Sequence, residues 1–153
     1  MKFGRIKHMK IVICASVDFT PKIKEIADVL LKQGHKVEIP LLSQKILNGE
    51  ISLEDFLRIK KEKGDIDFRR NSGEDLIKRY FHLIKKSDAV LIVNVDKNEI
   101  KNYIGGNTLL EIGFAYILDK KIFLLNEIPD ISYKDEIKAM QPVILNGDLS
   151  KVS

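Results

Sequence analysis

One carboxylate stands alone in an apolar stretch of this chain. Glu111 is the only charged residue between Leu109 and Leu118, where its neighbours are Leu, Ile, Gly, Phe, Ala and Tyr. A helix that is apolar on all sides is normally buried, and an isolated carboxylate is costly to bury unless a partner or a task explains it. Because buried, perturbed carboxylates concentrate at functional sites, Glu111 is the leading candidate for a catalytic group.

Glu111 also has an alternative interpretation that involves no chemistry. Thr108 and Glu111 have the spacing of a capping box, in which Thr108 would cap the helix and Glu111 would bond back to the Thr108 backbone N–H. Such an arrangement would satisfy the carboxylate. The two roles are compatible, because the first turn of a helix also stabilises negative charge.

The glycine pair before this helix is a weaker signal. Gly105 and Gly106 would allow close approach of a ligand to the backbone, where free N–H groups can hold a phosphate or a sugar hydroxyl, or they would simply make the turn. Neither the G-x-G-x-x-G fingerprint nor the P-loop pattern is present in the sequence. We therefore expect no cofactor.

The metal-binding and thiol residues do not form a pattern. His8, His35 and His82 lie near no Cys or acid at ligand spacing, so we expect no metal site. Cys14, the single cysteine, lies within the aliphatic run 11–15, which is typical of a small buried core residue. One cysteine allows no internal disulfide, which fits a reducing compartment.

Alternating aliphatic strands and amphipathic helices must position Glu111. Uniformly apolar strands predict a parallel sheet covered on both faces, so we expect an α/β, flavodoxin/Rossmann-like three-layer sandwich with five parallel strands in the order 2-1-3-4-5. Thr20 is the expected N-cap of the first helix, with Pro21 at its first position. The expected strands are 10–15, 36–39, 88–94, 121–125 and 142–145, and the expected helices are 20–34, 53–61, 76–84, 108–118 and 133–139.

Ligands of such sheets bind beyond the carboxyl ends of the strands, at the switch point between the first and third strands. This rule predicts three ligand-binding segments, which are 16–19, 94–96 and 105–111. Within them, the expected substrate-binding residues are Ser16, Asp18, Phe19, Asn94, Asp96, Gly105, Gly106 and Asn107.

Composition favours one globular domain over the whole of 1–153. The chain is 44% hydrophobic and 31% charged, with a net charge of +4 from interspersed residues of both signs. We expect no polymeric nucleic acid as a partner, no membrane association and a cytoplasmic location. A helical and loop excursion at 43–71 is either a solvated surface segment or a lid whose Arg69 and Arg70 contact an anion.

Three segments carry a resemblance to a known family. The sequences Ser-Asp-Ala-Val-Leu-Ile-Val at 87–93 and Thr-Leu-Leu-Glu-Ile-Gly-Phe-Ala-Tyr at 108–116 resemble the nucleoside 2-deoxyribosyltransferases and the related deoxynucleoside-monophosphate N-glycosidases. The Lys-Lys-Ile-Phe-Leu-Leu segment at 120–125 is similar to the lysine and strand that follow this helix in the family. The resemblance implies that Glu111 attacks the anomeric carbon of a 2-deoxyribosyl group and forms a covalent glycosyl–enzyme.

The chain also departs from the family pattern. The family usually has an acid about two helical turns before the Ser87-Asp88 pair, which helps to protonate the leaving base, and Tyr80 lies near that position here. The proton donor would then be Tyr80 itself, Asp18, Asp96 or a group of a neighbouring subunit. Asn107 stands where the family tends to have glycine.

The prediction is cleavage or exchange of the N-glycosidic bond of a deoxynucleoside or its monophosphate, with Glu111 and Tyr80 as the catalytic residues. The partner would be a small nucleoside or nucleotide, and the family implies a homodimer or higher homo-oligomer. The first alternative is a non-catalytic nucleotide-binding or sensing domain on the same fold. The second is a structural domain in which Glu111 only caps a helix.

Overall fold

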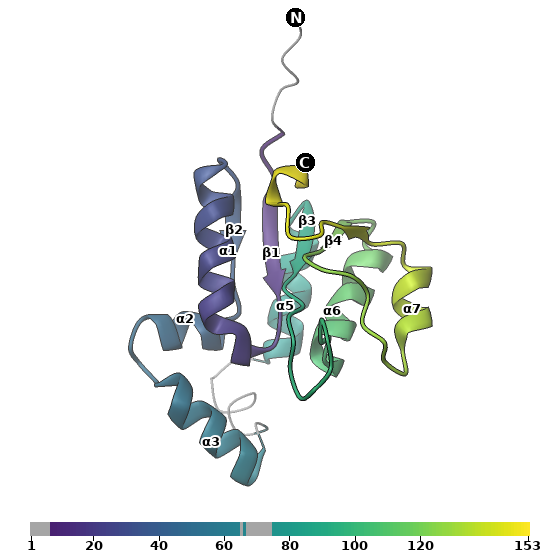
Figure 1. The fold of residues 1–153 in the computed structure, drawn as a ribbon. Helices are drawn as coiled ribbons and strands as arrows, with labels where there is room; N and C mark the ends of the chain where they lie inside the picture. Colours follow the sequence, from purple (N-terminus) through teal and green to yellow (C-terminus); the bar gives the residue numbers. More distant parts are fainter. Residues whose placement is uncertain (1–6, 65, 67–74) are drawn as a thin grey trace, which may run out of the picture.

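A five-stranded, all-parallel sheet forms the centre of the computed structural model, which describes residues 7–64, 66 and 75–153 (Figure 1). The strand order is β2-β1-β3-β4-β5, so the predicted α/β Rossmann-like fold and its 2-1-3-4-5 order are confirmed. The strands are β1 (Lys10–Cys14), β2 (Lys36–Glu38), β3 (Ala89–Ile92), β4 (Lys121–Leu124) and β5 (Val143–Ile144).

The middle of the sheet is buried on both faces. Val12 of β1 pairs in register with Val90 of β3, and Val90 pairs with Ile122 of β4. All four residues of β3 are buried, which is why the sequence of this strand is aliphatic throughout rather than alternating.

Helices cover the two faces of the sheet in separate layers (Figure 1). On one face, α1 (Thr20–Lys32) packs Ile23 and Leu30 against Ile11 and Leu91. On the other face, Ile84, Ile112 and Ile137 pack against the opposite side of the strands. They belong to α5 (Leu76–Lys85), α6 (Gly106–Ile117) and α7 (Lys134–Ala139). No helix among the described residues is long and apolar enough to cross a membrane.

The excursion contains two helices beside the carboxyl end of β1 (Figure 1). The expected helix at 53–61 is confirmed as α3 (Leu53–Lys63), and Ser52 caps it by accepting a hydrogen bond from the Asp55 N–H at 2.9 Å. Before it lies α2 (Leu41–Leu47), which the sequence interpretation missed. The predicted lid residues Arg69 and Arg70 lie outside the described residues.

Two predicted N-caps are wrong. The helix α1 begins at Thr20 itself with Phe19 as its cap, and the Thr20 hydroxyl instead donates to the Val17 carbonyl at 2.6 Å. The helix α6 begins at Gly106 with Gly105 as its cap, so Thr108 is already inside the helix. The capping-box interpretation of Glu111 therefore fails.

Candidate active site

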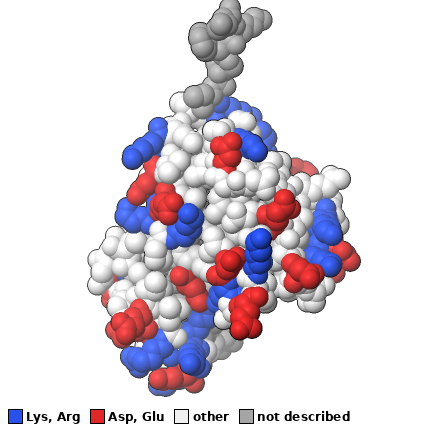
Figure 2. All heavy atoms as spheres, viewed as in Figure 1, with Lys and Arg blue, Asp and Glu red and all other residues white. Residues whose placement is uncertain are grey.

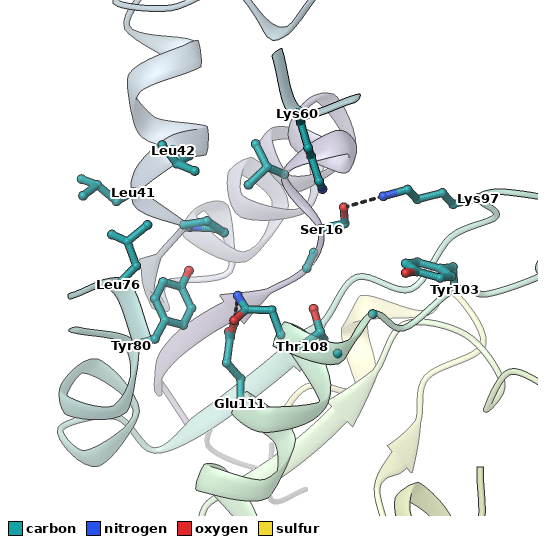
Figure 3. Close-up of a pocket in the computed structure, with 16 residues that line it drawn as sticks. Ser16, Leu41, Leu42, Lys60, Leu76, Tyr80, Lys97, Tyr103, Thr108 and Glu111 are labelled. Carbon is teal, nitrogen blue, oxygen red and sulfur yellow. Dashed lines mark hydrogen bonds between the residues drawn. The ribbon is translucent and has the colours of Figure 1, made fainter. Parts of the chain in front are cut away.

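A cavity of about 280 Å³ opens beside the carboxyl end of β1 and the first turns of α6. Figure 3 shows Glu111, Tyr80, Ser16, Lys60 and Lys97 around it, contributed by five separate segments of the chain. We call this cavity the cleft. Its lining consists of Ala15, Ser16, Val17, Pro40, Leu41, Leu42, Lys60, Leu76, Tyr80, Lys97, Tyr103, Gly105, Gly106, Asn107, Thr108 and Glu111.

Glu111 lines the cleft from the second turn of α6 and is only 5% exposed. Its Oε1 accepts a hydrogen bond of 3.2 Å from the Asn107 side-chain amide, one helical turn earlier (Figure 3). A hydrogen bond from an amide one turn earlier in the same helix helps to orient the carboxylate. Glu111 is therefore a largely desolvated carboxylate that faces the cleft.

Tyr80 reaches the cleft from α5, with a side chain that is 7% exposed. Its hydroxyl donates a 3.0 Å hydrogen bond to the carbonyl of Ile13 at the end of β1. Burial raises the pKa of Tyr80 well above its usual value, and the negative charge of Glu111 raises it further. The phenol is therefore neutral at physiological pH and its proton is already engaged.

Cys14 lies in the core next to the catalytic candidate. Cys14 is the last residue of β1, and its side chain is fully buried, as the sequence predicted. Burial raises the pKa of the Cys14 thiol well above its usual value, and the charge of Glu111 and a hydrogen bond with Glu111 raise it further. The thiol is thus a neutral neighbour of Glu111 rather than a nucleophile.

We expect Cys14 to be inert to thiol reagents in the native protein, because both burial and the nearby carboxylate oppose thiolate formation. A colorimetric thiol assay at mildly alkaline pH should detect no thiol in native buffer and one per chain in denaturant. Labelling at equal rates in the two conditions would contradict the buried position.

A cluster of charged residues lies at the mouth of the cleft, and two of its members were not predicted. Lys97 Nζ contacts Asp18 Oδ2 at 2.8 Å, and Lys60 Nζ contacts Asp18 Oδ1 at 3.5 Å. Ser16 donates to Asp18 Oδ1 at 3.0 Å and accepts from Lys97 Nζ at 3.2 Å. Burial acts to raise the pKa of Asp18, but the Lys97 hydrogen bond and the two lysine charges outweigh it and lower the pKa. Asp18 is therefore an anion held between two cations.

The remaining walls of the cleft are apolar or backbone. Leu41, Leu42 and Leu76 form an apolar side (Figure 3). On the opposite side, a Cβ added to Gly105 would approach the Tyr103 hydroxyl to 3.2 Å, so the tyrosine packs closely against this glycine. The combination of an apolar wall, a carboxylate and a cationic mouth suits a small ligand that has an apolar part and an anionic part.

Six predicted site residues line the cleft, and four do not. Glu111, Tyr80, Ser16, Gly105, Gly106 and Asn107 line it. Asp18 is adjacent and acts through the lysines, whereas Phe19 is buried in the core beside α1. Asp96 accepts the Asn102 N–H at 2.9 Å, and Asn94, which is 0% exposed, bonds to the backbone of 126–127. These last two residues organise the loops after β3 and β4.

The described residues were searched for side chains that could bind a metal ion together. Among the described residues there is no group of three or more His, Cys, Asp or Glu side chains that could hold a metal ion. The described residues that line the cleft offer one carboxylate, two phenols, two ammonium groups, two aliphatic hydroxyls and one side-chain amide.

The sequence and the structure were compared with known proteins. No protein-family model matches the sequence, and no curated protein matches it. Among solved structures, the chain is similar to the CMP N-glycosidase BcmB of Clostridium botulinum. The identity is 19%, the match covers 90% of each chain, and the TM-score is 0.44.

Proposed function

We propose that this protein cleaves or exchanges the N-glycosidic bond of a deoxynucleoside or a deoxynucleoside monophosphate. The observation that carries the proposal is Glu111, a 5% exposed carboxylate that lines the cleft and is oriented by Asn107. The family resemblance of the segment around Glu111 supports the same assignment. Burial of this kind is costly in free energy, and a nucleophile is the role that explains it best.

The proposed reaction has two displacements. A Glu111 carboxylate oxygen attacks the anomeric carbon while the bond from that carbon to the base nitrogen breaks, and the electron pair leaves with the base, which takes up a proton. Water or a second base then attacks the same carbon and releases the Glu111 carboxylate. Hydrolysis and base transfer differ only in which acceptor enters for the second step.

The cleft walls suggest how the ligand would be held. Leu41, Leu42 and Leu76 would contact the flat apolar face of the base, and the Gly105-Gly106 backbone would face the sugar. Figure 2 shows Lys and Arg interspersed with Asp and Glu on the face in view, which suits a small ligand better than a nucleic-acid polymer.

The second candidate function is a nucleotide-binding or sensing domain without turnover. It is favoured by the absence of a second acid, since Glu111 is the only carboxylate among the described residues that line the cleft. Tyr80, near the position where the family has an acid, has a raised pKa, and its hydroxyl donates a hydrogen bond to the Ile13 carbonyl. Binding without chemistry predicts a ligand-dependent rise in melting temperature and no product.

One experiment separates the two functions. The protein is incubated with each deoxynucleoside and each deoxynucleoside monophosphate, with and without a second free base, and the products are separated by chromatography. Free base indicates hydrolysis, and a new nucleoside indicates transfer. If neither product appears from any substrate, the enzymatic proposal is lost, and the melting temperatures of the same mixtures decide whether the protein binds nucleotides.

Replacement of Tyr80 by phenylalanine tests whether this phenol supplies the proton to the leaving base. Because its pKa is raised and its proton is engaged with Ile13, we expect base release to fall by less than about tenfold, a smaller effect than loss of a general acid. We expect unfolding to become easier by about 1 kcal/mol, the net value of one buried hydrogen bond. A loss of several hundredfold in rate at unchanged stability would instead identify Tyr80 as the proton donor.

The expected homo-oligomer stays a prediction, and exposed apolar side chains on α5 and α6 offer it a surface. Ile77 on α5 and Leu110 and Ile117 on α6 are all more than 40% exposed, on the two helices that cover the same face of the sheet. Sedimentation across a range of protein concentrations would measure the oligomeric state directly.

A further inference from the structure

Lys60 and Lys97 come from distant parts of the chain and converge on one point of the cleft. Lys97 belongs to the loop between β3 and α6, and Lys60 belongs to α3 in the excursion. Both line the cleft, and both contact the same carboxylate, that of Asp18. The side chain of Lys97 is only 17% exposed and that of Lys60 33%, whereas both side chains of the surface pair Lys24–Asp28 are about half exposed. The two lysines are therefore held in the cleft by their contacts, unlike a lysine on the solvated surface.

Each of the two ammonium groups lies near an aromatic ring. Lys97 Nζ lies 5.2 Å from the ring centre of Tyr103, and Lys60 Nζ lies 6.0 Å from that of Phe56. Phe56, one turn before Lys60 on α3, is 1% exposed. Two lysines, one carboxylate and the Ser16 hydroxyl leave a net positive charge at a partly desolvated cleft mouth, where an anion is attracted more strongly than in bulk water.

We propose that Lys60 and Lys97, with the Ser16 hydroxyl, form a subsite for the phosphate of a phosphomonoester, and that Asp18 is the counter-ion that holds the two lysines in place. Lysine ammonium groups and hydroxyl donors are common phosphate ligands. This inference rests on the proposed function and narrows its substrate class to monophosphates. It also assigns a task to α3, which brings Lys60 to the cleft.

The position of the subsite relative to Glu111 fits a sugar phosphate. Figure 3 shows Lys60, Ser16 and Lys97 grouped toward one end of the cleft, and Glu111 with Tyr80 toward the other. A phosphate bound by the lysines would therefore place its sugar between the two groups, on the way to the carboxylate. An unphosphorylated nucleoside would leave the lysines with Asp18 alone.

Binding of inorganic phosphate and of 2-deoxyribose 5-phosphate is measured by calorimetry in the parent and in Lys60→Met, Lys97→Met and the control Lys24→Met. We expect each cleft substitution to weaken binding of both anions by roughly tenfold, and the control to leave it unchanged. Lys24 is a matched control because it is also paired with an aspartate, at 2.7 Å, but on the exposed face of α1. Equal binding by all four proteins, or an equal loss in the control, overturns the proposal.

Asp18→Asn tests the role of the counter-ion. The amide keeps an oxygen that accepts from the lysines but removes a negative charge beside the incoming phosphate, so phosphate binding should strengthen several-fold and become more sensitive to salt. Asp28→Asn should change neither property. Weaker phosphate binding in Asp18→Asn would overturn the assignment of Asp18 as a counter-ion, because a counter-ion competes with the incoming phosphate for the two lysines. Melting temperatures of all variants show whether each is folded.

Further measurements distinguish a sugar phosphate from free phosphate as the ligand, and this inference from the proposed function. If 2-deoxyribose 5-phosphate binds no more tightly than inorganic phosphate, or if 2-deoxyribose binds as tightly as its phosphate, the phosphomonoester assignment is overturned. Phosphate binding that depends on the lysines in a protein without turnover would sink the proposed function alone. Turnover of monophosphates that is unaffected in both lysine variants would sink this inference alone.

Discussion

Replacement of Glu111 by glutamine should abolish release of free base, with a loss of about a thousandfold or more in rate, as expected when a nucleophile is removed from a site that acts as a unit. Glutamine has nearly the same shape, and its carbonyl oxygen can still accept the Asn107 hydrogen bond that Glu111 Oε1 accepts at 3.2 Å. The substitution therefore removes the charge and the nucleophilic oxygen and keeps the packing. Chromatography of the free base under single-turnover and steady-state conditions measures the effect.

The stability of this variant distinguishes lost chemistry from lost folding. Because glutamine keeps the shape of Glu111 and can still accept the hydrogen bond from Asn107, Glu111→Gln should remain folded, which its melting temperature measures. Glu136→Gln is the matched control, because Glu136 is exposed on α7 and does not line the cleft. Release of base by Glu111→Gln at the parent rate would end the case for Glu111 as the nucleophile.

The fold could be predicted because the central strands are buried on both faces. Aliphatic runs such as Ile11–Cys14 and Ala89–Val93 have no exposed side to alternate with, and only a parallel sheet between helical layers accommodates them. The seven-residue helix α2 was missed because it is too short to repeat an apolar pattern. The N-cap of α6 was predicted wrongly because Gly105 caps the helix without a side chain. The Thr108 hydroxyl matched the usual sequence pattern of an N-cap instead.

Only part of the site could be predicted, because the rule on strand ends says which loops lie at the site and does not say where their side chains point. Ser16, Gly105 and Asn107 line the cleft as that rule implies, but Asn94, from an equally well placed segment, is buried within the protein. Lys60 and Lys97 were missed for a different reason. They are two of 26 basic residues, and the contacts that distinguish them span 42 and 81 positions of sequence. A local sequence pattern cannot show a contact between residues that are so far apart in the sequence.

Asn94 shows what the ends of the strands need for themselves. Its Nδ2 donates to the carbonyls of Asn126 and Glu127, both at 3.0 Å, and its Oδ1 accepts the Asn126 N–H at 3.0 Å. The Asn126 side chain returns a hydrogen bond to the Asn94 carbonyl. One side chain thus satisfies three backbone groups where the chain leaves β4, directly beside the end of β3. This role engages both polar atoms of the Asn94 side chain.

Asn94→Ala should therefore lower the free energy of unfolding by about 3 kcal/mol, from three lost hydrogen bonds at roughly 1 kcal/mol each. For a chain of this size the melting temperature should fall by roughly 10 °C. Asn48→Ala, at an exposed helix end, should change it little. Because Asn94 holds the loops rather than the ligand, phosphate affinity of the folded variant should stay near that of the parent. A variant of parental stability that binds nucleotide poorly would return Asn94 to the ligand site that the strand-end rule assigns to it.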